Sequence, residues 1–351
     1  MWTEKGEKGD RPLFPLSSAG KRGLSPFCSE KGSALLLVLW LSAALAAIAF
    51  SLAGTVRTET ERASNTLDGV KAYYLATGAI ERALLYMQWG PAYQQPGGVS
   101  RYYSPWMTVL PFSFPTGEAV VEILPESSKL SLNASSPEVL YRLFLALGPS
   151  PERSREIVEA IMDWRMPAPG GAPTLFDQFY LSQAPSFLAR HASFQEVEEL
   201  LLVKGMTPEL FHGGFGRDPS GRLVPLTGAR DCLSVYSSGN AIDVNTAPPA
   251  VLQAAGLPPD LVERVVRTRA EQPFRTPQEV QVIQNAAGPI GARLRIGGNS
   301  IFTLRASARL RLDGGKLSDL RRAVSATVKI GATATGHPYE VLRWQDRAWA
   351  Q

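Results

Sequence analysis

The residues best suited to catalysis do not form a catalytic pattern in this chain. Its three histidines, His191, His212 and His337, lie far apart, and none belongs to an HExxH motif. No G-x-S-x-G segment supplies a nucleophilic serine. We therefore interpret the histidines as loop or core residues, and we predict that the protein has no catalytic residues and is not an enzyme.

Glycine-rich and cysteine-containing segments also indicate no nucleotide, metal or disulfide site. The segment 213–216 lacks the Lys-Ser/Thr of a phosphate-binding loop, and 314–316 lacks the upstream glycine, so both are predicted turns. Cys28 and Cys232 form no CxxC or Cys/His pattern of the kind that binds zinc. The residues themselves predict no metal ligands and no cofactor.

Composition and charge are those of a folded protein without a strong attraction to nucleic acid. Hydrophobic residues make up 44% of the chain and charged residues 19%, so the chain can bury a sizeable core. The net charge of +4 is small, and the basic excess gathers in residues 299–351. The middle of the chain is close to balanced, which argues against nucleic acid as a partner.

An uncharged stretch, residues 33–56, predicts a membrane-spanning helix. About 20 apolar residues in a helix cross the hydrocarbon layer of a bilayer. Basic residues precede the stretch, which favours a cytoplasmic N-terminus, although Arg57 follows it directly. A cleaved secretory signal is the alternative, but the apolar run is too long and the helical pattern continues beyond it.

That continuing pattern predicts one helix over residues 33–89, half in lipid and half packed on a soluble part. Apolar residues recur at steps of three and four. They are Ala63, Leu67, Val70, Tyr74, Thr77, Ile80, Leu84 and Met87. We expect this stripe to pack on a sheet and on helices of partner proteins.

The junction before the apolar stretch resembles a prepilin signal. Glu30, Lys31 and Gly32 directly precede Ser33. The resemblance implies that a prepilin peptidase cuts between Gly32 and Ser33 at the cytoplasmic face and leaves the helix on the mature protein. Most pilin-like subunits have glutamate as the fifth mature residue, where this chain has Leu37. In the superfamily, that absence marks the minor pseudopilin K of type II secretion, which lies at the filament tip.

Alternating residues predict an antiparallel sheet formed by two separated parts of the chain. Ala119, Val121 and Ile123 share one face of a first strand. Later faces are formed by Phe302, Leu304, Ala306, Ala308, Leu310 and Leu312, and by Val324, Ala326, Val328 and Ile330. The turn 313–316 joins these strands. Ser325 and Thr327 fall on the opposite face, which we expect to be solvated together with most of the surplus positive charge.

Between the strands lies an α-rich stretch with an imperfect repeat. The segment 133–140 matches 245–252 with Asn, Pro and Leu at the same offsets. We expect Asn133 and Asn245 to cap the first helix of each copy. The pattern resembles the helix-hairpin-helix of DNA-binding competence receptors, which is the alternative function. Pro258 stands where a second glycine would present its amide to phosphate, and the other turn, 148–151, also contains prolines, which disfavours that alternative.

Several blocks together resemble the K minor pseudopilins of type II secretion. They are Asp163-Trp164, 198–210, 233–240, 242–248 and the final strand 339–344. The resemblance implies an inner-membrane, single-pass protein with a periplasmic C-terminal part. Its implied partners are other minor pseudopilins through their N-terminal helices, the prepilin peptidase and the inner-membrane secretion platform. Type II secretion and a type IV-like pilus both fit these motifs at this point.

The expected fold class is α+β. A long N-terminal helix packs on a pilin-like antiparallel sheet that carries an inserted α-rich domain with helix-hairpin-helix-like repeats. The expected boundaries are a leader at 1–32, the helix at 33–90 with its span at about 33–56, a sheet domain at 91–130 and 299–351, and an insertion at 131–298.

The resemblance also implies calcium in the α-rich domain, held by acids that follow the Asp-Trp pair. Calcium takes six to eight oxygen ligands, several of them carboxylates. Here Asp163 is followed by a segment without further acids, up to Asp177. Asp177, Asp231 and Asp243 could contribute oxygen ligands from elsewhere in the chain, but their spacing forms no calcium motif. Since the ligand run is largely missing, we predict no metal site.

Overall fold

The computed structural model describes most of the chain beyond the predicted leader. The described residues are 33–94, 100–217, 220–238, 241–298, 300–331 and 336–346. The chain divides into two units, one ending at Ser64 and the other beginning at Asn65, and each is described by itself. The predicted leader, with Gly32, lies outside the described residues.

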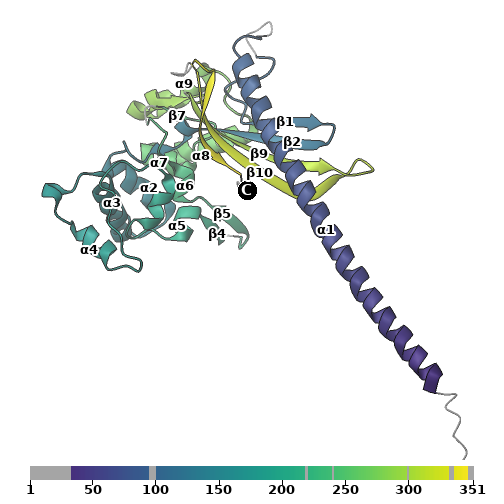
Figure 1. Cartoon of the computed structure of the whole chain (residues 1–351). Helices are drawn as coiled ribbons and strands as arrows, with labels where there is room; N and C mark the ends of the chain where they lie inside the picture. Colours follow the sequence, from purple (N-terminus) through teal and green to yellow (C-terminus); the bar gives the residue numbers. More distant parts are fainter. Residues whose placement is uncertain are drawn as a thin grey trace, which may run out of the picture. The chain divides into compact units, whose positions relative to one another are not determined.

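Helix α1, Ser33–Trp89, is a single unbroken helix over the range that the sequence predicts (Figure 1). It contains no proline and is rich in alanine and leucine, which favour helix most strongly. It ends directly before Gly90 and Pro91, since proline cannot continue a helix.

In the first unit, the side chains of α1 are exposed on every side. Leu37 is 67% exposed and Trp40 75%. Among the described residues, α1 is the helix whose length and composition allow it to cross a membrane. A helix that is apolar all round needs either a protein core or lipid around it.

In the second unit, one face of α1 packs on the sheet through four alanines and four larger apolar residues. The buried residues are Ala72, Leu75, Ala76, Ala79, Ile80, Ala83, Leu84 and Met87. Only the later part of the predicted stripe packs on the sheet, because Leu67, Val70 and Tyr74 are exposed. Alanines face the sheet instead, since their small side chains let the helix axis approach the strands closely.

Five strands form one antiparallel sheet in the order β1-β2-β9-β10-β11. They are β1 Val109–Phe114, β2 Gly117–Pro125, β9 Ile301–Arg311, β10 Leu317–Ile330 and β11 Tyr339–Gln345. The predicted alternation is confirmed, because Ala119, Val121 and Ile123 are buried in the same core as Leu304 and Ala306. Leu312, expected on this face, lies beyond β9 and is exposed.

The face of the sheet opposite α1 is partly covered, although the alternation predicts a solvated face. Ser325 and Thr327 are each only 7% exposed. The hydroxyls of Thr303 and Thr327 lie 2.9 Å apart and share a hydrogen bond. These polar residues are buried because Glu126 and other residues of the α-rich stretch lie over this part of the sheet.

The α-rich stretch leaves the sheet after β2 and returns at β9. Pro125 and Phe302 are register partners, so the chain departs and re-enters at the same end of two neighbouring strands. The helical elements are η1 Glu126–Ser128, α2 Pro137–Leu147, α3 Pro151–Arg165, η2 Pro169–Gly171, α4 Leu175–Leu181, η3 Val197–Leu202, α5 Pro208–His212, α6 Ala229–Cys232, α7 Pro249–Ala255, α8 Pro259–Glu271, α9 Pro277–Ala286 and η4 Gly288–Arg293. The short strands are β3 Leu130–Ser131, β4 Gly214–Arg217, β5 Leu223–Leu226, β6 Leu233–Ser234, β7 Ile242–Asp243 and β8 Leu294–Arg295.

The buried apolar residues of the described chain form two separate cores. One lies between α1 and the sheet. The other lies within the α-rich stretch and runs from Leu130 to Leu294, with Phe144, Trp164 and Tyr180 among its largest side chains. The core between α1 and the sheet therefore includes no buried apolar residue from the described part of the α-rich stretch.

The sequence repeat corresponds to a repeated structural clamp. The Asn133 side chain donates to the carbonyl oxygen of Phe194 at 3.0 Å and accepts from its amide at 2.8 Å. Asn245 holds Phe274 in the same way, at 2.9 Å and 2.9 Å. The prediction that these asparagines cap helices is wrong, because Ser136 caps α2 and α7 begins after Pro248 without a side-chain cap.

An arginine completes each copy of the clamp. Arg165 donates to the carbonyl oxygens of Leu132 and Ser135, at 2.8 and 2.7 Å. Arg269 donates to those of Val244 and Ala247, at 2.9 and 2.7 Å. These carbonyls stand one residue before and two residues after the asparagine in both copies. The first helices of the two copies, α2 and α7, pack against each other.

Candidate functional site

The predicted processing and filament positions lie at the start of α1. Ser33 is the first residue of the helix, and Gly32 is outside the described residues. Leu37 lies in the second turn and points its apolar side chain outward. An ionised carboxylate at such a place would cost about 2.5–3.5 kcal/mol within a membrane unless it were partnered, and leucine carries no such cost.

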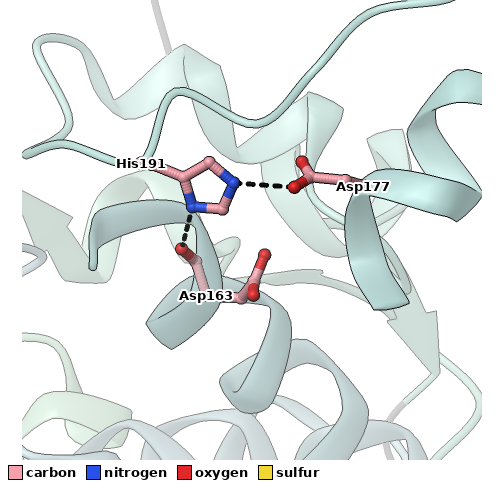
Figure 2. A group of neighbouring side chains, drawn as sticks. All are labelled: Asp163, Asp177 and His191. Carbon is pink, nitrogen blue, oxygen red and sulfur yellow. Dashed lines mark hydrogen bonds and ion pairs between the residues drawn. The ribbon is translucent and has the colours of Figure 1, made fainter. Parts of the chain in front are cut away.

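Three titratable side chains meet in the α-rich stretch (Figure 2). Asp163 comes from the end of α3, Asp177 from α4 and His191 from the loop that follows α4. One ligand atom from each lies within 4.8 Å of the others. Asp177 is almost fully buried, and the His191 side chain is 17% exposed.

Helix capping fixes the position of Asp177. Thr174 and Asp177 form a capping box at the start of α4, in which the Asp177 amide donates to the Thr174 hydroxyl and the Thr174 amide donates to Asp177 Oδ2. The Ala189 amide donates to Asp177 Oδ1 at 3.1 Å. The carboxylate thus joins the start of α4 to the loop that carries His191.

His191 contacts acceptors with both ring nitrogens. Nε2 lies 2.9 Å from Asp177 Oδ2, and Nδ1 lies 3.1 Å from the backbone oxygens of both Asp163 and Met166. The φ angle of His191 is 49°, in the left-handed region that costs a non-glycine residue about 1–2 kcal/mol. Its surroundings therefore hold the residue in place.

The charges of the trio depend on one another. Burial opposes the imidazolium form of His191, but the hydrogen bonds to Asp177 and Met166 outweigh it and raise the pKa of His191 above its ordinary value. Burial likewise opposes an ionised Asp177, but the Thr174 amide and His191 outweigh it and lower the pKa of this carboxyl. Burial raises the pKa of Asp163, although Thr174 and His191 partly oppose it.

The residues present do not suit the calcium ion that the resemblance implies. Five of the six ligand atoms of the trio already take part in hydrogen bonds: Asp163 Oδ2, both oxygens of Asp177 and both nitrogens of His191. Calcium needs six to eight oxygens. In the described part of the chain, Asp231 and Asp243 are not members of this group.

Asp243 instead has a structural role in the second repeat. It is fully buried and accepts from the Gly297 amide at 2.7 Å, the Asn245 amide at 3.4 Å and the Thr246 hydroxyl. Burial is the main reason that its pKa is raised. These bonds join β7 to the segment that leads back to the sheet.

A polar cleft of about 620 Å³ lies between the α-rich stretch and the sheet. Its floor is Glu126, a buried carboxylate that accepts from Lys129 at 3.2 Å, from the Thr303 hydroxyl at 2.6 Å and from the Ser234 hydroxyl. Burial opposes ionisation, but Lys129 and the two hydroxyls outweigh it and lower the pKa of Glu126. The carboxylate links β6 to β9.

A second link crosses the rim of the cleft. Arg343 of β11 donates to Glu198 and Glu196 of the α-rich stretch, at 3.1 Å each. His212, which lines the cleft, places Nδ1 3.3 Å from Arg230. The residues of the cleft mostly bind one another, so we interpret the cleft as a junction.

Cys232 and the turns at Gly148 and Gly256 have structural surroundings. Cys232 is buried, and burial raises the pKa of its thiol to about 12, which opposes formation of a reactive thiolate. Gly148 and Gly256 end the first helix of each repeat with φ angles of 107° and 110°. In the second copy, Pro258 and Pro259 follow within three residues, so the turn lacks amides for a phosphate.

The trio could not be predicted from spacing, because Asp163, Asp177 and His191 follow no metal or catalytic motif. His191 was expected to be a loop or core residue, and it does lie in a loop. Its partners are brought to it by the capping box of α4 and by the end of α3. The role of Nδ1 depends on where two backbone carbonyl oxygens lie, and the sequence pattern does not show their positions.

Comparisons with known proteins agree on one family. Residues 121–213 and 242–295 match two domains, both described as Type II secretion system (T2SS), protein K. The type II secretion system protein K of Klebsiella pneumoniae is 26% identical over 251 residues, covering 66% of this chain and 72% of that protein.

A solved structure shares the fold. It is one chain of "The Crystal Structure of the GspK-GspI-GspJ complex from enterotoxigenic Escherichia coli Type 2 Secretion System". The TM-score is 0.53 at 15% sequence identity, and the match covers 82% of this chain and 100% of that chain. At this identity the likeness concerns the fold alone.

A membrane-length apolar helix, an antiparallel sheet packed on the same helix and an inserted α-rich stretch place the chain among α+β proteins with a helix able to cross a membrane. The family matches narrow that class to one protein family. The chain belongs to the type II secretion system protein K family, whose members are structural components of secretion.

Proposed function

We propose that this chain is the minor pseudopilin at the tip of a type II secretion pseudopilus, where it acts in assembly and in protein export across the outer membrane. The supporting observation is that one helix serves both as the membrane-length segment and as the core of the folded part. Such a helix ties the folded part to any bundle that its apolar half joins.

The tip position follows from Leu37. Filament subunits of pilin type are joined when the fifth-residue carboxylate meets the N-terminal amine of a neighbour. A chain with leucine at this position offers its own amine at Ser33 but no carboxylate for a subunit above it. It can therefore end a filament, and it is not suited to continue one.

Processing sets the topology in this proposal. A prepilin peptidase cleaves between Gly32 and Ser33 at the cytoplasmic face, and the helix stays in the inner membrane as a single span. The N-terminus is then cytoplasmic, and the sheet with its α-rich, helix-hairpin-helix-like insertion is periplasmic. The inner-membrane secretion platform and the peptidase are the partners on that side.

Other minor pseudopilins are the proposed lateral partners. The similar solved chain comes from a complex of GspK with GspI and GspJ. In this chain, Leu67, Val70 and Tyr74 are exposed on the part of α1 that packs on the sheet, at 60%, 46% and 67%. An exposed apolar helix face of this kind suits packing against the N-terminal helix of another pilin-like subunit.

The decisive test is the N-terminal sequence and intact mass of the full chain, expressed with and without its prepilin peptidase. We expect a chain that begins at Ser33 only when the peptidase is present. A Gly32→Ala variant should remain uncut and serves as the control for the site. A chain that stays uncut with active peptidase, or is cut beyond residue 56, would contradict the proposal.

A further inference from the structure

The two copies of the repeat differ in the length of one connection. Five positions separate Arg269 from Phe274, whereas 29 separate Arg165 from Phe194. The asparagine and arginine clamps hold both ends of each connection in the same way. The connection in the first copy is therefore 24 residues longer than that in the second. We call the whole of this longer connection, residues 166–193, the insert.

A connection of this length is ordered only by contacts of its own, because the entropy cost of closing a loop grows with its length. Part of the insert packs on the end of α3. The rings of Tyr180 and Phe187 lie 5.6 and 6.3 Å from the ring of Trp164, and they stack on each other at 5.1 Å. These contacts hold α4 and the residues just after it, and leave the last residues of the insert to be fixed.

His191 fixes them. Its Nε2 faces the Asp177 carboxylate and its Nδ1 faces the backbone oxygens of Asp163 and Met166, as Figure 2 shows for the first two residues. Carbonyl and carboxylate oxygens only accept hydrogen bonds. Asp177 also accepts two backbone amides, which favours its ionised form. Both nitrogens of His191 must then donate, and a ring that does so is the imidazolium cation.

We propose that protonated His191 is the cation that fastens the insert to α3 and α4, in the domain where the family resemblance implies a calcium ion. Its charge thereby balances that of the Asp177 carboxylate from within the fold. This inference concerns the α-rich stretch alone, and it does not rest on the proposed function.

The charged groups around His191 are consistent with this role. Asp163 faces it from α3 and Asp177 from α4. The neighbouring Arg190 is turned toward Glu199 of η3, with Nη1 3.4 Å from Oε1. The single positive charge among these two carboxylates is that of His191, and the Thr174 hydroxyl donates to Asp163 Oδ2 at 3.1 Å.

The first test measures opening of the insert in the full chain in detergent. Trypsin cleavage after Arg190 is timed for the wild type, for His191→Gln and for His212→Gln as the matched control. We expect cleavage of His191→Gln to be on the order of tenfold faster, because the variant loses charge-assisted hydrogen bonds to Asp177 and to the backbone. The His212→Gln variant should behave as the wild type, and neither calcium chloride nor EDTA should change the wild-type rate.

Two outcomes would overturn the proposal. Equal cleavage of the wild type and His191→Gln would show that the ring does not fasten the insert. Protection of the wild type by calcium or zinc, reversed by EDTA, would show that the trio binds a metal.

A second measurement uses only the wild-type chain, so it does not depend on the folding of a variant. Nitrogen-15 labelling of the histidines in the wild-type chain, observed by NMR in EDTA at neutral pH, reports the protonation of each ring nitrogen. We expect the ring of His191 to keep both of its protons at neutral pH, where an imidazole of ordinary pKa is mostly neutral. Three neutral rings would overturn the proposal.

Discussion

At the scale of single residues, the pairing of His191 with Asp177 links the stability of the α-rich stretch to pH. The pKa of His191 is raised on folding, so its contribution is complete below the ordinary value of 6.5 and is lost as the pH rises through the folded value. The pKa of Asp177 is lowered, so its contribution is complete above 3.8 and is lost as the pH falls through the folded value.

The corresponding prediction concerns thermal unfolding in EDTA. The Tm of the wild type should exceed that of His191→Gln most between about pH 4 and about pH 6.5, and the difference should shrink as the pH rises further. Its size should be about 2–4 °C for each kcal/mol lost in a domain of this length. Circular dichroism melts over a pH series measure it. A difference that stays constant from acidic to alkaline pH would contradict the expectation.

At the scale of elements, the two asparagine clamps perform the same task with different surroundings. Asn133 and Asn245 each pair with the backbone of one phenylalanine as a neighbouring strand would, and each is followed four residues later by the first residue of a helix. Their equal geometry implies that each copy of the repeat depends on its clamp to a similar degree.

Replacing either asparagine tests this dependence. Asn133→Ala and Asn245→Ala each remove two hydrogen bonds and leave a backbone amide and a carbonyl without their partner, at a cost of about 1–3 kcal/mol. Asn→Asp at either position keeps the acceptor and loses the donor, so it should cost less than alanine. Chemical denaturation gives the free energy of unfolding, and hydrogen exchange reports the amides of Phe194 and Phe274. If one substitution lowers the free energy of unfolding and the other leaves it unchanged, the two clamps are not equivalent.

At the scale of the whole molecule, Leu37 is the residue that we expect to limit the number of copies in a filament. Leu37→Glu supplies the carboxylate that other pilin-like subunits carry. Its cost of about 2.5–3.5 kcal/mol in the membrane is offset only where a neighbour's amine pairs with it. We expect the variant to enter filaments beyond the tip, seen as more copies relative to the major pseudopilin by quantitative mass spectrometry.

The matched control is Leu39→Glu, which bears the same charge two residues further along and should not gain copies. If Leu37→Glu leaves the ratio of the two proteins unchanged, the assignment of the tip to Leu37 fails.

Sequence patterns predicted the parts of the fold in which one face is apolar. The alternation at Ala119, Val121 and Ile123 identified β2 and its buried side, because side chains of a strand alternate between two faces. The range of α1 was predicted as well, since no proline interrupts it and the helical spacing of apolar residues continues beyond the uncharged stretch. These features depend on neighbours in the sequence.

Features that depend on distant parts of the chain could not be predicted. Thr327 is polar and lies on the expected solvent face, yet Glu126 and the α-rich stretch cover it. The first turns of α1 that face the sheet use alanines, so the pattern of larger residues did not show which part of the stripe, such as Leu67 and Tyr74, stays off the sheet. The role of His191 rests on two backbone carbonyls and a capping residue, none of which its own sequence context specifies.

The shared departure point of the α-rich stretch has a mechanical consequence. Because Pro125 and Phe302 are paired, a force that pulls the α-rich stretch away from the sheet reaches β2 and β9 at the same end. Hydrogen bonds loaded from one end break one after another, which takes less force than breaking them together. The Glu126 contacts to Ser234 and Thr303, and those of Arg343, lie across that path and bring β9 and β11 under load at once. Traction on the α-rich stretch would therefore meet this polar junction before the strands begin to separate.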